Sequence, residues 1–412
     1  MMASGWETKT VGQIAVVKGG KRLPAGSTLQ SLPTAHPYIR VTDMRDGTVK
    51  IDDIRYVPDA AAPAIRNYRI HSDDIYISVA GTLGLIGRVP AQLSGGNLTE
   101  NADRLTAIEC DVDYLKYYLA SEEVQDEIDA IRTVGAQPKL ALGRIRDFRI
   151  RIPLDRREQE RIAGALRDAD RLIDLIRIRI KKARDIHNGL SRDLLTGSVR
   201  ISGRTGEWSQ LAVSTQSHLK ARIGWQGLTT AEYRTAGSHL LVGGTAFQNG
   251  RIDWNTVPFV DQGRYNQDPN IQLRVGDVLL TKDGTIGKVA YIDHLPGPAT
   301  LNSGVFVIRP KSGAYDSAFL YCLLTSRAFA DFVVGLSAGS TINHLYQRDL
   351  ASLEFLAPED IEEQRAIARV LLDSEAALMH LRRRLSAARA IKTGMMQQLL
   401  TGRVRLKEYP KS

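Results

Sequence analysis

The sequence predicts an α+β protein in which two mixed α/β domains of similar pattern are separated by two long antiparallel coiled-coil helices. Residues 153–201 recur as residues 358–406, at a shift of 205 residues and with about 20 of the 49 positions identical. A long internal repeat indicates a duplicated structural unit. Each copy has the apolar spacing of a long helix. The segment before each copy combines strand patterns with one helical pattern.

Both copies of the repeat are expected to begin with the same helix cap. Asp155 and Asp360 can each accept a backbone hydrogen bond in the first turn. Glu158 and Glu363 stand three residues later, which is the spacing of a capping box. The two helices are therefore predicted to start at equivalent positions.

Apolar residues then recur at alternating spacings of three and four, the heptad pattern of supercoiled helices. Gly197 and Gly402 follow the last turns, where a left-handed residue is favoured. A helix of about 40 residues is a rod of about 60 Å. If the two seams face each other within one chain, the rods run antiparallel, with one domain at each end and an approximate two-fold axis. The seam consists of Ile162, Leu166, Ile173, Ile176, Ile180, Ile367, Leu371, Leu378, Leu381 and Leu385.

The domain boundaries are expected at the ends of the two repeats. The predicted segments are a first domain over 1–152, a first spacer helix over 153–201, a linker over 202–206, a second domain over 207–357, a second spacer helix over 358–406 and a C-terminal tail over 407–412.

The two domains repeat a pattern of strands followed by a helix. The expected strands are 38–44, 73–81 and 103–109 in the first domain, and 239–247, 276–284 and 303–310 in the second. The expected helices are 111–132 and 316–335. The closest match between the domains is a strand that runs into a Gly-Thr-x-Gly turn, at 73–84 and 276–287, where glycine permits a sharp bend. Elsewhere the domains share little sequence. This divergence is typical of modules that recognise different targets, and equally of drift in a duplicated structural domain.

Composition indicates a globular protein whose basic charge favours an anionic partner, although many soluble proteins are equally basic without one. The chain of 412 residues is long enough for two or more domains. Its net charge of +9 favours nucleic acid first and a membrane surface second. The two cysteines, Cys110 and Cys322, exclude a disulfide framework and suit a reducing compartment. The opening MMASGWETKT lacks the apolar core of a signal peptide, and no apolar run is long enough to span a membrane. We therefore expect a cytoplasmic protein without a membrane partner.

Sequence motifs for catalysis or cofactor binding are absent. GTIGK at 284–288 lacks the spacing of a phosphate-binding loop, and no G-x-G-x-x-G follows a predicted strand. The histidines form no H-E-x-x-H motif, and no G-x-S-x-G elbow occurs. Acidic pairs such as Asp52–Asp53 are typical of solvated turns. The sequence therefore predicts neither a catalytic nor a metal site, and an enzyme is the least favoured class.

The motifs at the helix ends resemble those of a known family. The helices open with Pro153-x4-Glu158-Gln159-x2-Ile162 and Pro358-x4-Glu363-Gln364-x2-Ile367, and close with LLTGSVR (194–200) and LLTGRVR (399–405). Together with the upstream Gly-Thr-x-Gly turns, they resemble the DNA specificity subunit of type I restriction–modification systems. The likeness covers nearly the whole chain, in the family's order of recognition domain, conserved helix, recognition domain, conserved helix.

The resemblance implies a non-catalytic subunit that binds double-stranded DNA. Each target recognition domain would read one half of a split, asymmetric sequence, and the helices would set the gap. The subunit would assemble with two adenine-specific methyltransferase subunits, which bind S-adenosylmethionine. Restriction subunits, which hydrolyse ATP with magnesium, can join further. The chain itself would hold no cofactor. The alternative from another class is a pseudo-symmetric coiled-coil scaffold that organises protein partners without reading sequence.

Candidate DNA-binding residues are basic or amide side chains in predicted loops, because these groups contact phosphates and base edges. In the first domain they are Lys18, Lys21, Arg22, Arg40, Arg45 and Thr82. In the second domain they are Arg222, Gln226, Arg264, Asn266, Gln267, Lys282, Thr285 and Lys288. Thr82 and Thr285 lie in the matching turns and are candidates for phosphate contacts. The basic stretches 177–184 and 382–389 face either phosphates or a partner subunit, or are solvated outer faces of the coiled coil.

Overall fold

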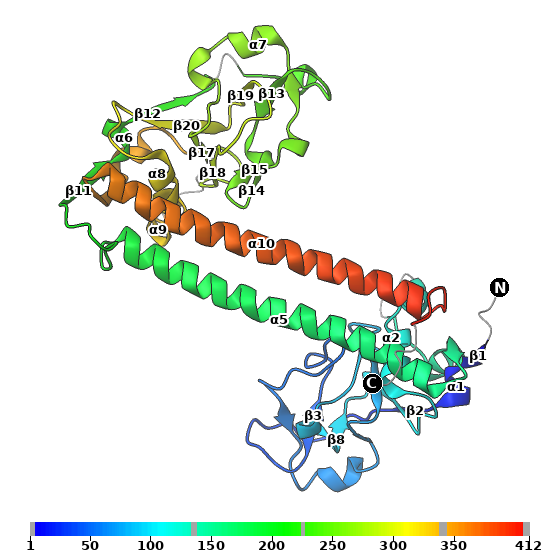
Figure 1. The fold of residues 1–412 in the computed structure, drawn as a ribbon. Coiled ribbons are helices and arrows are strands. Elements are labelled where there is room, and N and C mark those ends of the chain that lie inside the picture. The colour runs from blue at the N-terminus through cyan, green and yellow to red at the C-terminus, as the bar shows by residue number, and fades with distance from the viewer. Residues whose placement is uncertain (1–4, 133–137, 224–226, 338–343, 407–412) are drawn as a thin grey trace. The chain divides into compact units, whose positions relative to one another are not determined.

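The computed structural model describes residues 5–132, 138–223, 227–337 and 344–406 (Figure 1). The chain divides into two compact units, one made of Met1–Arg177 with Arg383–Ser412 and the other of Ile178–Arg382. Each unit holds one α/β domain and one end of each of two long helices, α5 (Arg156–Leu195) and α10 (Ile361–Leu399). The boundary between the two units therefore falls within both long helices.

The first domain is built on two four-stranded sheets and one strand pair. One sheet has the order β2 (Val16–Gly19), β9 (Ala102–Thr106), β6 (Ile75–Ser78) and β7 (Ile86–Gly87). The other has the order β4 (Arg55–Tyr56), β3 (Pro37–Ile39), β8 (Gly96–Leu98) and β5 (Arg69–Ile70). The strand pair is β1 (Trp6–Thr10) with β10 (Arg149–Pro153).

Helices of the first domain cover one face of the β2–β9–β6–β7 sheet. They are α1 (Val11–Ile14), α2 (Val112–Leu119), α3 (Glu122–Arg132) and α4 (Leu142–Asp147). The 3-10 turns Ala62–Ile65 and Ala91–Leu93 pack in other clusters, with β3 of the second sheet. Val17, Leu105 and Ile75 of this sheet share one buried cluster with Leu115 of α2. Tyr76, on the opposite face of its strand, packs in a second cluster with Ile39 of the other sheet. Alternation along the strands thus gives the sheet two apolar faces.

The second domain repeats the central four-stranded sheet and the terminal strand pair of the first, and differs in the smaller sheets. Its central sheet has the order β12 (Ser217–Ala221), β20 (Val305–Pro310), β17 (Val278–Thr281) and β18 (Val289–Tyr291). The smaller sheets are β16 (Phe259–Val260), β13 (His239–Val242) and β19 (Ala299–Leu301), then β14 (Phe247–Gln248) with β15 (Arg251–Ile252), and β11 (Trp208–Ala212) with β21 (Glu354–Pro358). The α-helices are α6 (Val213–Gln216), α7 (Gln262–Asn266), α8 (Ser317–Leu324) and α9 (Arg327–Ser337). The 3-10 turns are Thr230–Glu232, Gly244–Ala246, Trp254–Thr256, Pro269–Ile271 and Asp349–Ser352.

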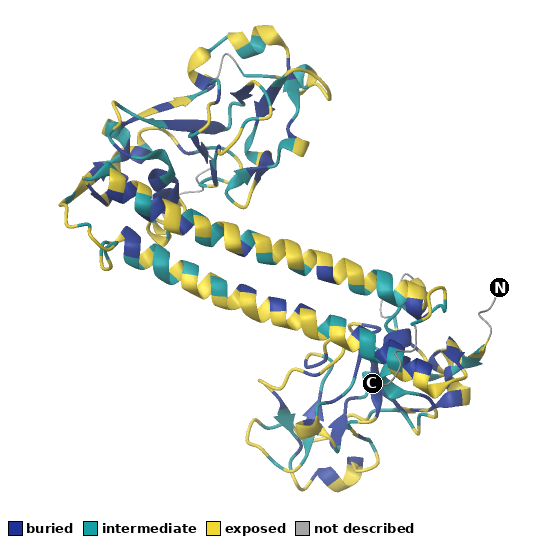
Figure 2. Cartoon of the chain, viewed as in Figure 1, coloured by how far each residue is buried: buried dark blue, intermediate teal, exposed yellow. Residues whose placement is uncertain are grey.

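Contacts inside each unit show that α5 and α10 run antiparallel. In the first unit, Ile162 near the start of α5 shares a buried cluster with Leu399 at the end of α10. In the second unit, Leu194 at the end of α5 shares a buried cluster with Ile367 at the start of α10. The predicted antiparallel helix pair is thus confirmed. Figure 2 shows buried positions recurring along each largely exposed helix.

The predicted seam residues differ in burial along the two helices. Ile162, Leu166, Ile173, Ile176, Ile180, Ile367, Leu371 and Leu378 are buried, whereas Leu381 and Leu385 are half-buried.

The predicted capping boxes are wrong, although the cap residues themselves are as expected. Asp155 Oδ1 accepts a hydrogen bond from Arg157 N at 3.0 Å, and Asp360 Oδ1 accepts one from Glu362 N at 2.9 Å. The Glu158 and Glu363 carboxylates bind arginine guanidinium groups instead. A two-pronged charged pair is stronger than one bond to a backbone amide.

Two predicted helices are each broken into a pair. Residues 111–132 form α2 and α3, and residues 316–335 form α8 and most of α9. The second pair is bent by 58° at the break. None of the helices in the described part of the chain is by itself long and apolar enough to cross a membrane, and α8 with α9 meets that length and composition only as a bent pair.

The strand predicted over 38–44 ends at Ile39 because a turn follows it. Arg40 N donates to Asp43 Oδ2 at 2.9 Å, and Asp43 N donates to Arg40 O at 3.0 Å. This side-chain bond competes with strand pairing, which is typical of aspartate in turns.

Candidate nucleic-acid interface

Three segments of the first domain meet at one end of its central sheet. β2 and β6 both pair antiparallel with β9, so β2 and β6 end where β9 begins. The first residue beyond β2 confirms this arrangement, since Gly20 N donates to Ala102 O at 3.0 Å. Lys21 and Arg22 follow β2, Thr82 follows β6, and all three side chains are exposed. The structure therefore brings these three predicted residues to one edge.

The Gly-Thr-x-Gly turns have the same construction in both domains. The φ angles are +76° at Gly81, +79° at Gly84, +70° at Gly284 and +84° at Gly287, all in the region that favours glycine. Ser78 Oγ at the end of β6 accepts from Leu85 N at 2.8 Å, and Thr281 Oγ1 at the end of β17 accepts from Lys288 N at 2.9 Å. A hydroxyl at the strand end thus closes each turn and fixes the residue at its tip.

Basic side chains at this edge of the first domain reach solvent. Arg22 Nε donates to Glu100 Oε1 at 2.8 Å, yet its side chain stays 80% exposed. Lys21 Nζ lies 5.8 Å from the centre of the Tyr68 ring. Lys18 is exposed on β2 beside Arg104 of β9. Exposed cations that are at most weakly paired suit contacts with phosphates.

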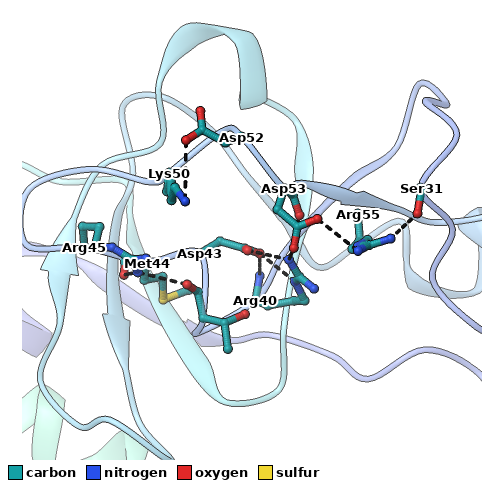
Figure 3. A network of polar contacts seen from close by, with 10 residues as sticks. Ser31, Arg40, Asp43, Met44, Arg45, Lys50, Asp52, Asp53 and Arg55 are labelled. Carbon is teal, nitrogen blue, oxygen red and sulfur yellow. Dashed lines mark hydrogen bonds and ion pairs between the residues drawn. The ribbon is translucent and has the colours of Figure 1, made fainter. Parts of the chain in front are cut away.

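Arg40 and Arg45 belong to the loop network of Figure 3, between β3 and β4. Arg40 Nη2 donates to Asp43 Oδ1 and to Asp53 O, both at 2.7 Å. The Asp43 carboxylate raises the pKa of Arg40 through its hydrogen bond. Arg45 is exposed, but its Nη1 donates to the carbonyl oxygen of Met44 at 2.6 Å. Arg40 therefore holds the loop together, whereas Arg45 has donors left for a ligand.

The second domain brings its own candidates to the corresponding edge. Lys282 follows β17 and Lys288 precedes β18, with the Thr285 tip between them. Thr285 and Lys288 are exposed. Lys282 is half-buried, with its Nζ 5.6 Å from the centre of the Phe306 ring.

Lys220 is a candidate that the sequence analysis missed. In β12 it follows buried Leu219, as Lys18 follows buried Val17 in β2, and both lysines are exposed. Leu219 pairs with Ile308 of β20 as Val17 pairs with Leu105 of β9. The apolar–lysine order in the two strands was the available signal, but the surrounding residues differ.

Arg222 is an internal residue of the second domain. Its side chain is 2% exposed, and its Nε donates to Leu301 O at 2.9 Å. Burial lowers the pKa of this guanidinium, and the nearby charge of Arg264 lowers it further. Arg222 therefore anchors the strand end rather than facing a duplex.

The other candidates of this domain lie on α7, directly after it, or outside the described residues. Arg264 forms a 2.6 Å ion pair with Glu232, and Gln267 accepts from Arg264 Nη1 at 3.1 Å. Asn266 is exposed beside them. Gln226 lies outside the described residues.

The helix-end motifs bind one another in both units. In the first unit, Arg405 donates from Nε and Nη2 to Glu158 at 2.9 and 2.5 Å. In the second unit, Arg200 donates from the same atoms to Glu363, both at 2.6 Å. Each arginine thus comes from the end of one repeat and each glutamate from the start of the other. The repeated E-Q and LLTG-x-V-R motifs therefore bind each other, and each arginine–glutamate contact between them is called a joint.

A glutamine completes the joint in each unit. Gln159 Nε2 donates to Pro153 O at 2.8 Å and its Oε1 accepts from Asp111 N at 2.8 Å. Gln364 makes the same two bonds, to Pro358 O at 2.7 Å and from Asp316 N at 2.8 Å. The motif glutamines therefore tie the long helix to the strand before it and to the start of the domain helix.

Among the described residues, the two cysteines are not activated thiols and the acidic, histidine and cysteine side chains form no metal cluster. Burial raises the pKa of Cys110 to about 11 and also raises the pKa of Cys322, so both thiols stay protonated near neutral pH. No group of three or more His, Cys, Asp or Glu side chains able to hold a metal occurs in the part of the chain that the structure describes.

Comparison with known proteins decides the family. The profile described as type I restriction modification DNA specificity domain matches residues 3–183 and 244–386, which is more than half of the chain. The chain belongs to the type I restriction–modification DNA specificity family. As a specificity subunit it is a non-catalytic component, and its role is DNA sequence recognition in complexes with other subunits.

Relatives of this specificity subunit are similar over nearly its whole length. It is 25% identical over 419 residues to the type I restriction enzyme MjaVIII specificity subunit of Methanocaldococcus jannaschii, covering 98% of this chain and 93% of the relative. Its fold is similar to that of a type I restriction–modification S subunit from M. genitalium, with a TM-score of 0.63 at 15% identity over 96% of each chain. A chain from a structure of the type I R-M system matches with a TM-score of 0.57 at 16% identity, over 98% of this chain and 100% of the other.

Proposed function

We propose that each α/β domain reads one half of a two-part DNA sequence with the edge formed by the loop after β2 or β12 and the Gly-Thr-x-Gly turn. The observation that carries this proposal is the duplication of the edge on two otherwise divergent domains. A side-chain hydroxyl at the equivalent position, Ser78 or Thr281, closes each turn, and an exposed lysine, Lys18 or Lys220, stands on the strand that leads into the other loop, β2 or β12. A shared scaffold with different loops suits two readers of different bases.

The candidate side chains at the edges, and on the neighbouring β3–β4 loop and α7, divide into two roles. Lys18, Lys21 and Arg22 in the first domain are proposed to bind phosphates, as are Lys220 and Lys288 in the second. Thr82 and Thr285 at the turn tips are proposed phosphate ligands as well. Arg45 and Asn266 carry the planar donor groups that read base edges, and are the proposed readers. Half-buried Lys282 is proposed as a further DNA contact in the second domain.

The long helices are proposed to act as the spacer between the half-sites. Two readers that engage one face of a duplex need half-sites separated by about one helical turn. The partners proposed are two adenine-specific methyltransferase subunits that bind S-adenosylmethionine, joined in the restriction complex by subunits that use ATP and magnesium. Because the proposed target is DNA, the cytoplasm is the proposed place of action.

Selection of randomised duplexes by the purified complex with its methyltransferase subunit tests this proposal. The expected result is enrichment of one asymmetric motif in two parts. Replacing Lys18 and Lys220 by alanine should weaken binding to all sequences without changing the motif. Absence of any enriched motif would contradict sequence reading and favour a scaffold that only organises protein partners. Methylation by the chain alone would contradict the proposal that the partner subunits carry the methyltransferase activity.

A further inference from the structure

Two grooves occupy equivalent positions in the two units. The α5-end groove, of about 700 Å³, lies in the second unit between the end of α5, the turn from α8 to α9, and β21. The α10-end groove, of about 490 Å³, lies in the first unit between the end of α10 and the turn from α2 to α3. The shift of 205 residues relates their walls, for example Leu195 to Leu400 and Thr196 to Thr401.

The two grooves differ in charge at two matching positions, where acidic Glu122 and neutral Gln397 of the α10-end groove stand against Arg327 and Arg192 of the α5-end groove. One further charged residue of the opposite sign lines each groove, Arg403 at the α10 end and Glu354 at the α5 end. In the α10-end groove, Gln397 Nε2 donates to Glu122 Oε2 at 2.8 Å and so bridges the two walls. The matching residues of the α5-end groove are Arg192 and Arg327. Two guanidinium groups cannot form such a hydrogen bond across the groove, because both are cationic donors without an acceptor. The α5-end groove therefore stays open between two arginines.

Both arginines of the α5-end groove remain available to a ligand. Arg192 Nε donates to the adjacent Asp193 at 2.8 Å, and Arg327 Nε donates to Asp331 at 2.8 Å. The side chains nevertheless remain 75% and 88% exposed. Such surface pairs are weak, so an incoming carboxylate can replace or share them at little cost.

The floor of the α5-end groove is apolar. Leu195, Leu323 and Phe355 line it and are buried, and Leu356 beside them is 46% exposed. At the position matching Leu356, the first unit has Arg151, which pairs with Glu123 at 3.3 Å. The combination of exposed leucine with two arginines suits a protein segment better than DNA, whose interfaces are polar and strongly charged.

We infer that the α5-end groove is a docking site for an acidic, leucine-bearing segment of a partner protein subunit. Apolar side chains of the segment pack on Leu195 and Leu356, and its carboxylates bind Arg192 and Arg327. The α10-end groove does not accept this segment, because Glu122 repels carboxylates. The inference rests on the proposed function, in which the chain assembles with other subunits. It adds that the two halves offer those subunits chemically different sites.

A peptide-binding assay on the full-length chain tests the inference. The probes are a fluorescent peptide of glutamate and leucine, and the same peptide with lysine in place of glutamate. We expect the acidic peptide to bind and the basic one to bind at least tenfold more weakly. The double variant Arg192→Gln with Arg327→Glu copies the α10-end groove and should lose about tenfold in affinity for the acidic peptide. Leu356→Arg should weaken binding independently.

The reciprocal variant is the matched control. Glu122→Arg with Gln397→Arg copies the α5-end residues into the other groove and should leave binding of the acidic peptide at least as strong. All substituted positions are exposed or half-buried, and unchanged thermal unfolding will show that the variants fold. Equal binding by the wild type and the α5-end variants would overturn the inference. Displacement of the peptide by random duplex DNA would assign the groove to the DNA surface and also overturn it.

The assay separates this inference from the proposed function. Peptide binding needs neither DNA nor a methyltransferase subunit. Loss of motif enrichment with intact peptide binding would contradict only the proposed DNA reading. Intact motif enrichment without peptide binding would contradict only the docking site.

Discussion

Single carboxylates hold the starts of the two long helices. The Glu363 side chain is fully buried and receives two bonds from Arg200, whose side chain is 30% exposed. A buried carboxylate is tolerated only where a charged partner and hydrogen bonds replace water. Arg200 also stacks near Trp208, with its guanidinium 5.5 Å from the ring centre. We therefore expect the charge of Glu363 to contribute more to the stability of the second unit than an ion pair on the surface does.

Glu363→Gln should destabilise the second unit by about 2 kcal/mol, because it removes the charge that Arg200 binds. This is less than for a fully buried pair, since Arg200 remains partly solvated. Glu362→Gln, on the same turn and 59% exposed beside Arg365, should cost less than about 0.5 kcal/mol. Urea unfolding of both variants measures the difference. Equal stability of the two variants would show that the joint contributes little.

The proposed phosphate contacts are also tested residue by residue. Lys18→Ala and Lys220→Ala should each lower the slope of log affinity against log salt by about one. Arg222→Ala should leave the salt slope unchanged. It should instead destabilise the second domain, because Arg222 is buried and donates a hydrogen bond to Leu301 O. Binding measured across a salt series, with unfolding as the control, separates the two effects. An unchanged slope for both lysine variants would remove β2 and β12 from the interface.

At the scale of elements, the Gly-Thr-x-Gly turns join the sheet edge to a helix. A Cβ atom built on Gly84 would lie 3.2 Å from Ile128 Cγ2 of α3, and one built on Gly287 would lie 3.1 Å from Val333 Cγ2 of α9. Space around Gly81 and Gly284 is open. The last glycine of each turn therefore lets a helix approach, and the first only supplies the bend.

Alanine substitutions separate these two tasks. Gly81→Ala should cost about 1 kcal/mol, the price of a left-handed residue with a side chain. Gly84→Ala adds the contact with α3 and should cost about 3 kcal/mol in total. Thermal and urea unfolding of the two variants give the comparison. A smaller effect at Gly84 than at Gly81 would contradict the packing of the turn against α3.

The elements that the sequence predicted well are those set by local periodicity. The heptad spacing located α5 and α10, and Gly197 and Gly402 end them with φ of +73° and +69°. The breaks between α2 and α3 and between α8 and α9 were missed, because the helical period continues on both sides of residues 120–121 and 325–326. Glu158 and Glu363 were misassigned because their partners lie 247 and 163 residues away.

The candidate site was less predictable for the same reason. Arg222 has the composition of a surface reader, but contacts 78 and 79 residues away bury it. Arg40 is occupied by Asp43 and Asp53 in the network of Figure 3. Lys220 shares with Lys18 only an apolar residue before the lysine, and the register of β12 with β20 is what identifies it as the equivalent residue. Loop side chains acquire their roles from distant strands, which no local pattern reports.

At the scale of the whole molecule, the chain builds the same joint twice by exchanging motifs between its halves. The end of each repeat supplies an arginine to the glutamate at the start of the other. The two repeats are therefore interchangeable in principle, since Arg200 and Arg405 occupy matching positions and so do Glu158 and Glu363. One half carries all the parts needed to form the joint with a second copy of itself.

A fragment of residues 1–204 should consequently form a homodimer. Truncation removes Leu399 from the cluster that contains Ile162 and Leu166, and removes Arg405 from Glu158. Arg200 of a second fragment can replace Arg405, so the uncovered seam and the unpaired carboxylate are both satisfied by pairing.

Sedimentation analysis should show a dimer that Arg200→Gln weakens. With a methyltransferase subunit, the dimer should select a palindromic DNA motif, because both readers are then the first domain. A fragment that stays monomeric at high concentration, or a dimer indifferent to Arg200→Gln, would show that the motif exchange does not hold the helices together.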